Sequence, residues 1–156
     1  MKLSFFAFVC LVTVVALAAP QRPDFAGSWE FNPGKSKNIG MMMQVKMTDT
    51  IQQTDSTLDE TSHSIFQGND QEMKTHYDLT GKPANNDSPM EGASETVSKW
   101  DGNKLVTTWT SQSAVAGGPK VVRTETRSLS PDGNTMTIES VRGSNLAVVM
   151  VFDKKR

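Results

Sequence analysis

A strict alternation of side chains over residues 72–79 limits the folds that are open to this chain. One side of the extended backbone carries Met73, Thr75, Tyr77 and Leu79, and the other carries Glu72, Lys74, His76 and Asp78. A period of two is typical of a β-strand with one face on a core and one face in water. No later segment shows a sustained helical period, and Thr, Ser, Val and Ile recur, which favours strands. We therefore expect an all-β fold.

Two turn sequences indicate how these strands connect. Asp101-Gly102-Asn103 and Ser130-Pro131-Asp132-Gly133 each separate two strand-like segments, and such residues favour hairpins. The expected strands cover residues 27–31, 44–53, 58–66, 72–79, 94–100, 104–112, 120–129, 134–142 and 145–152. A meander of this kind predicts an antiparallel up-and-down β-barrel of about eight to nine strands.

The longer connections predict where a barrel of this kind would open. Alternate connections of a meander lie at opposite ends, so the loops 81–93 and 113–119 are expected to share one end and form a ligand entrance. The two tight turns then share the other end. By the same count, the loop 32–43 falls at the tight-turn end and could plug it.

The N-terminus has the pattern of an export signal. Lys2 precedes an apolar run over residues 3–15, and Ala16-Leu17-Ala18 matches the small-x-small cleavage pattern. We predict a signal peptide at residues 1–18, one domain at residues 19–156, and a secreted or periplasmic protein without a membrane span after cleavage. An uncleaved N-terminal anchor is the alternative. The only cysteine, Cys10, lies in the apolar run, so the mature chain would have no disulfide.

Composition argues against several classes of function. The chain has 16 basic and 17 acidic residues, which is no footprint for nucleic acid. His63 and His76 are expected to face water, and no nucleophile-elbow motif is present, so we predict no enzyme activity and no cofactor. The methionines, including Met41-Met42-Met43, could bind Cu(I), but gap filling in an apolar core is the favoured interpretation, and no metal site is predicted.

The inner faces of two strands predict a cavity. On residues 104–112 the expected inner set is Leu105, Thr107, Trp109 and Ser111. On residues 120–129 we expect Arg123, Glu125 and Arg127 to face water, which leaves Val122, Thr124, Thr126 and Ser128 inside. Small hydroxyl-bearing side chains leave space and hydrogen-bond donors for one small ligand. The predicted ligand-binding residues are Met73, Tyr77, Thr107 and Trp109; a packed interior is the alternative.

Several segments resemble a known group of barrels. Gly27-Ser28-Trp29 opens the first strand, and further similar segments lie at residues 25–33, 99–106, 128–134 and 151–154. In these segments the chain resembles the lipocalin-like barrels of the calycin group, and more specifically a group of small exported bacterial proteins of unknown role. The resemblance implies binding of an apolar ligand, and an arginine near the last strands, here Arg142, stacked on Trp29.

These features together predict a non-catalytic exported protein that binds a small, partly apolar molecule in the barrel interior. The alternative is a protein-binding barrel with a packed core, such as an inhibitor or an envelope accessory factor. In that case the loops or an edge strand would contact a protein partner.

Overall fold

The computed structural model of the chain describes residues 22–88 and 92–156, so the predicted signal peptide lies outside the described residues. The described part contains one short 3-10 helix, η1 (Gly40–Gln44), and ten strands. The strands are β1 (Gly27–Phe31), β2 (Lys46–Gln53), β3 (Thr57–Phe66), β4 (Asn69–Asp78), β5 (Ala84–Ser88), β6 (Gly92–Asp101), β7 (Lys104–Ser111), β8 (Val121–Leu129), β9 (Thr135–Arg142) and β10 (Val148–Lys154). Within these residues no helix is long and apolar enough to cross a bilayer.

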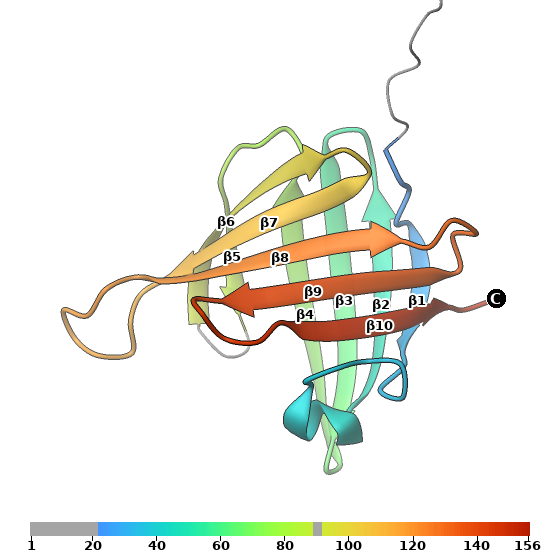
Figure 1. Cartoon of the computed structure of the whole chain (residues 1–156), viewed down its shortest axis with the longest axis horizontal. Helices are drawn as coiled ribbons and strands as arrows, with labels where there is room; N and C mark the ends of the chain where they lie inside the picture. The colour runs from blue at the N-terminus through green and yellow to red at the C-terminus, as the bar shows by residue number, and fades with distance from the viewer. Residues whose placement is uncertain (1–21, 89–91) are drawn as a thin grey trace, which may run out of the picture.

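Each strand pairs antiparallel with its neighbours along one continuous sheet, in the order β4-β3-β2-β1-β10-β9-β8-β7-β6-β5. The pairing of β1 with β10 joins the start and the end of the meander and curls the sheet into a barrel. In Figure 1, β6–β10 cross in front of β1–β4 at a steep angle, so the barrel consists of two layers around one interior. The predicted all-β antiparallel barrel is confirmed, with slightly more strands than expected.

The additional strand is β5, which lies within the segment 81–93 that the sequence suggested was a single loop. Its residues Ala84–Ser88 are mostly Asn, Asp and Ser, which have low β-propensity, so composition gave no strand signal. The strand forms because its backbone pairs with β6 from Ala84↔Thr96 to Ser88↔Gly92. Tertiary pairing here overrides local preference.

The barrel has a seam between β4 and β5, the two ends of the sheet order. The Asn86 side chain bridges it. Its Oδ1 accepts a hydrogen bond of 2.8 Å from the His76 backbone N–H, and its Nδ2 donates to the His76 carbonyl at 2.8 Å. Nδ2 also donates to Thr96 Oγ1 on β6 at 2.8 Å. One amide side chain thus pairs with the backbone of the facing strand, as a neighbouring peptide group would.

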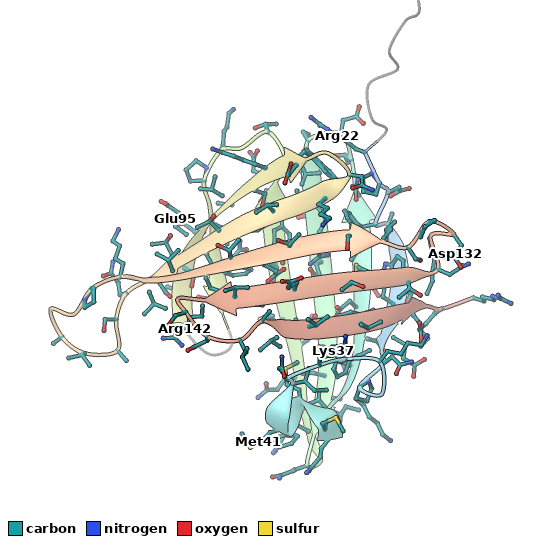
Figure 2. All side chains as sticks on the ribbon, in the orientation of Figure 1. Arg22, Lys37, Met41, Glu95, Asp132 and Arg142 are labelled. Atoms are coloured by element: carbon teal, nitrogen blue, oxygen red, sulfur yellow. The ribbon has the colours of Figure 1, made fainter. Side chains whose placement is uncertain are left out.

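The two ends of the barrel differ in their connections. One end, which we call the turn end, holds the short connections 54–56, 79–83, 102–103 and 130–134 together with residues 22–26 and the C-terminus. The opposite loop end holds 32–45, 67–68, 112–120 and 143–147. In Figure 2, Arg22 and Asp132 mark the turn end at the top and right, while Met41 and Arg142 mark the loop end at the bottom and left.

This arrangement corrects two predictions about the ends. The loop 32–43 does not lie with the tight turns; it lies at the loop end, as does the segment 113–119. The segment 81–93 does not form one entrance loop, because β5 divides it and places 79–83 at the turn end. Both errors have one cause, which is that β5 was not recognised as a strand. In a meander, one missing strand moves every connection that precedes it to the opposite end of the barrel, relative to the connections that follow it.

Apolar side chains close the interior at both ends. Phe25, fully buried, lies at the turn end, and its backbone N–H donates to Gln53 Oε1 at 2.9 Å. At the loop end Ile39 is buried, and Met42 packs against the same core. The other two methionines of the triplet, Met41 and Met43, are exposed. The 32–45 segment therefore covers the loop end with two apolar side chains.

The first-strand tryptophan is fully buried, and its Nε1 donates to the Phe25 carbonyl at 2.8 Å. The cation over the Trp29 ring is Lys154, with Nζ 5.2 Å from the ring centroid. Arg142, expected at this place, lies at the loop end of β9, whereas Lys154 pairs directly with Trp29 across β1 and β10. Strand register, rather than the type of cation, decides which side chain reaches the ring.

Candidate functional site

Three of the four predicted ligand-binding residues lie buried in the barrel interior. Tyr77 on β4 and Trp109 on β7 face each other across it in an edge-to-face arrangement, with ring centroids 6.1 Å apart. Thr107, two residues before Trp109 on the same face of β7, shares a hydrogen bond of 2.8 Å with Ser98 on β6. Met73 lies on the Tyr77 face of β4, nearer the loop end, and is half-buried. The structure thus brings Tyr77 and Trp109 together and places the other two on the same inner faces.

The faces of β8 are the reverse of those predicted. Glu125 and Arg127 are buried, Arg123 is nearly so, and Val122 is half exposed. The register explains this, because residues paired across a ladder share a face. Arg123 pairs with Trp109, Glu125 with Thr107, and Arg127 with Leu105, all of which point inward. The expectation that charges must face water fails here because these charges neutralise one another.

A network of ion pairs crosses the interior from β8 to β3. Arg127 Nη2 donates to Glu60 Oε2 at 2.5 Å and lies 3.7 Å from Glu125 Oε1. It also donates a longer hydrogen bond of 3.4 Å to the Tyr77 hydroxyl. Arg123 Nη1 donates to the other oxygen of Glu125 at 2.9 Å. Sequence reasoning missed Glu60 entirely, although its place two residues after Leu58 on β3 puts it on the inner face.

A third carboxyl, Asp49 on β2, lies beside this network. It is buried and accepts a hydrogen bond from the Ser62 hydroxyl. Burial, followed by repulsion from Glu60, raises the pKa of Asp49 from 3.8 to about 8, although the Ser62 hydrogen bond acts in the opposite direction. Asp49 is therefore mostly protonated at neutral pH.

Two other interior groups keep their usual charge. Burial, and then the carboxylates of Glu125 and Glu60, raise the pKa of Tyr77 well above 10, so its phenol stays neutral. Burial alone would lower the pKa of Arg127, but Glu60, Tyr77 and Glu125 more than offset this, and the pKa is raised. At neutral pH the Tyr77 phenol and most of the Asp49 carboxyl are therefore uncharged, whereas the Arg127 guanidinium keeps its positive charge.

Among the described residues, the buried donors that lack a hydrogen-bond partner include Trp109 Nε1, Arg127 Nη1 and the Ser111 hydroxyl of the interior. Each belongs to a residue that is at most 3% exposed. Trp109 and Ser111 are two residues apart on one face of β7, and the Tyr77 ring contacts both Trp109 and Arg127. A buried donor without a partner costs about 1–3 kcal/mol. These groups are therefore a set of donors that lacks an acceptor.

Two hollows on the surface of the described residues are lined by none of the predicted ligand-binding residues. The larger, about 340 Å³, lies at the turn end and is lined by Arg22, Asp24, Gln53, Thr54, Asp55, Leu79 and Trp100. There the Arg22 guanidinium lies 5.4 Å from the Trp100 ring centroid, and Trp100 stacks on Phe25. The other, about 280 Å³, is lined by Glu30, Phe31, Asn32, Pro33 and Asp153. Each includes at least two acidic side chains, so these hollows are wet.

His63 and His76, which were expected to face water, lie on the outer surface of the barrel. His76 Nδ1 is 2.6 Å from Asp59 Oδ1, and His63 Nε2 is 2.7 Å from Asp70 Oδ1, with all four side chains about half exposed. Both pairs join β3 to β4 across their outer face. Ion pairs at such exposed sites contribute little to stability. They show no geometric relation to the interior donors.

The sequence matches no family model and no curated protein. Solved structures are similar to it in fold. The fatty acid transporter REP1-NXSQ has a TM-score of 0.64 at 14% identity, covering 84% of this chain and 96% of that chain. Fatty-acid-binding protein 1 of Echinococcus granulosus has a TM-score of 0.64 at 14% identity, covering 85% and 98%. Human cRBP IV has a TM-score of 0.63 at 14% identity, covering 85% and 99%. The chain therefore has the calycin barrel fold that these proteins share.

Proposed function

We propose that this protein binds a small, partly apolar molecule inside its barrel and does not catalyse a reaction. The observation that carries the proposal is the set of buried donors without acceptors, Trp109 Nε1, Arg127 Nη1 and the Ser111 hydroxyl. They lie beside the aromatic rings of Tyr77 and Trp109, so a molecule placed there gains both apolar contact and hydrogen bonds. Met73, Tyr77, Thr107 and Trp109 are the proposed contacts.

The fold supports this proposal by analogy. Two of the similar structures are, by their names, a fatty acid transporter and a fatty-acid-binding protein, and a third is a Schistosoma mansoni fatty acid binding protein in complex with arachidonic acid. A shared fold does not transfer a ligand, because function depends on the residues of the site. The interior of this chain must therefore be tested directly.

Entry is proposed at the loop end. The 32–45 segment covers that end with only Ile39 and Met42, and the long 112–120 connection lies at the same end. The turn end is closed by Phe25, which Gln53 holds by a hydrogen bond to its backbone. Withdrawal of the two apolar side chains at the loop end would disturb less structure than removal of Phe25.

The binding test uses Nile red, an uncharged dye with a carbonyl acceptor that fluoresces in apolar surroundings. We expect the native protein to take up the dye, and Trp109→Phe, which removes one donor, to bind it about tenfold more weakly. Trp100→Phe is the matched control, because the Trp100 indole is also without a hydrogen-bond partner but lies at the turn end. An absence of dye uptake by the native protein would contradict the proposal, as would equal losses in the two variants.

A protein-binding barrel remains the second candidate, and two observations favour it. The Arg127–Glu60 ion pair spans the interior and fills part of it. In addition, the exposed large apolar side chains of the described residues all lie at the loop end; they are Met41, Met43, Ile65, Val115, Val122 and Leu146. Exposed apolar groups that gather in one region are typical of contact surfaces. If the native protein takes up no dye, this candidate becomes the better one.

Export is part of the proposal and has its own test. The signal pattern at residues 1–18 predicts a mature chain that begins at Ala19. We expect the protein isolated from its own source to have the mass and the N-terminal sequence of residues 19–156. A chain that still begins at Met1 would contradict both the cleavage and the predicted location.

A further inference from the structure

We infer that the molecule bound in this barrel carries an uncharged polar end, such as a hydroxyl, an ester or an amide carbonyl, and that carboxylates are disfavoured. This inference rests on the proposed function and concerns the same interior donors. It separates this chain from the similar structures named for fatty acids, whose ligands carry a carboxyl group.

The guanidinium that could receive a carboxylate already has two carboxylate partners at its Nη2. Arg127 is 2% exposed, and its Nη2 donates to Glu60 at 2.5 Å, with Glu125 3.7 Å away. The second guanidinium, Arg123, donates to Glu125 at 2.9 Å and stacks over the Trp109 ring at 4.5 Å. The protein's own carboxylates thus take the positions that an acidic ligand would need.

The charge balance of the interior opposes a further anion. Two guanidiniums face the carboxylates of Glu60 and Glu125, and Asp49 is protonated near neutral pH. A ligand carboxylate would place an uncompensated negative charge beside two existing ones, in a buried site where an unpaired charge is strongly disfavoured. The alternative is to bind a proton with the ligand, which weakens binding as pH rises.

The free hydrogen-bonding capacity fits a neutral acceptor. Trp109 Nε1, Arg127 Nη1 and the Ser111 hydroxyl are all donors, so an oxygen with lone pairs can satisfy them without changing the net charge. An ammonium group offers no acceptor to the indole and guanidinium donors, and it would lie beside the positive charge of Arg127. Hydrogen bonding and charge therefore disfavour a cationic group at this place, and charge also disfavours an anion.

The test compares hexadecanol, methyl hexadecanoate and hexadecanoic acid, which have the same chain length, as competitors of Nile red at neutral pH. We expect the alcohol or the ester to displace the dye at least about tenfold more effectively than the acid. Failure of all three to displace bound dye would overturn the inference. If the acid displaces it as well as the others, the inference is wrong, but interior binding stands.

Glu60→Gln gives an independent readout, because it removes the carboxylate from Arg127 without changing the shape of the side chain. We expect the affinity for hexadecanoic acid to rise about tenfold while the affinity for hexadecanol changes much less. Glu95→Gln, an exposed position on β6, is the matched control and should leave both affinities unchanged. A Glu60→Gln protein that folds and still prefers the alcohol to the same degree would contradict the inference. The wild-type comparison decides the matter if this variant does not fold.

Discussion

At the scale of single residues, the buried charges of β8 tie the two layers of the barrel together. Arg127 connects β8 to Glu60 on β3, so one side chain bridges the two layers of the barrel. Loss of Arg127 would leave Glu60 buried without its ion-pair partner, and such losses commonly cost about 3–5 kcal/mol. The network therefore fixes how far apart the layers can be.

Asp49 leads to a prediction about pH. Its pKa of about 8 in the folded protein lies above the ordinary 3.8, so between these values the folded state holds a proton that the unfolded chain has lost. The contribution of Asp49 to stability is therefore complete below about pH 4 and is lost as pH rises towards 8. Asp49→Asn cannot titrate and its side-chain oxygen can still accept from Ser62.

We expect Asp49→Asn to gain stability relative to the wild type as pH rises. Between about pH 5 and pH 8, the difference in unfolding free energy between variant and wild type should shift by more than about 1.4 kcal/mol in favour of the variant. Urea denaturation of both proteins at several pH values measures this. Stability curves that stay parallel across the range would show that Asp49 ionises normally in the folded protein.

At the scale of elements, the seam between β4 and β5 is the least supported junction of the barrel. Every other neighbouring pair of strands is joined by a backbone ladder, whereas here the side chain of Asn86 supplies both hydrogen bonds to the backbone of His76. Elements held by few contacts open at low free energy. The seam is therefore where the described structure should open first.

Asn86→Ala removes this bridge and is expected to lower the unfolding free energy by about 1–3 kcal/mol. Amide hydrogens of β4 and β5 should exchange faster in the variant, while those of β8 and β9 change less. Asn85→Ala is the control, because Asn85 is an exposed neighbour on the same strand. Equal effects of the two substitutions on exchange at β4 would show that Asn86 does not hold the seam.

At the scale of the whole molecule, sequence patterns predicted the architecture well because strand periodicity and turn chemistry are local. The alternation around Tyr77 and the turn at Gly102, whose φ is +57°, both appear as expected. The interior was harder to predict. Which way β8 faces depends on its register with β7, and β5 exists only because β6 pairs with it. Both depend on contacts between strands, which a local pattern does not contain.

The residues of the candidate site also fall into a group that local patterns predicted and a group that they did not. Tyr77, Thr107 and Trp109 were placed inside by the alternation of their own strands. Arg127 and Glu60 were missed, because each carries a charge that looks solvent-exposed until its partner, 67 residues away in sequence, is known. The mutually compensating signs of Arg123, Glu125 and Arg127 along one face were the only local signal.

The bridging amide of Asn86 also has a consequence for chemical modification of the chain. Asn86-Asp87-Ser88 is an acceptor sequence for N-linked sugar, and the sugar would replace a hydrogen on Nδ2. In the folded barrel both hydrogens of that nitrogen are engaged, one by the His76 carbonyl and one by Thr96 Oγ1. A glycan on Asn86 Nδ2 is therefore incompatible with both of the hydrogen bonds that this nitrogen donates in the folded barrel. A cell able to glycosylate this asparagine would have to do so before β5 docks at the seam.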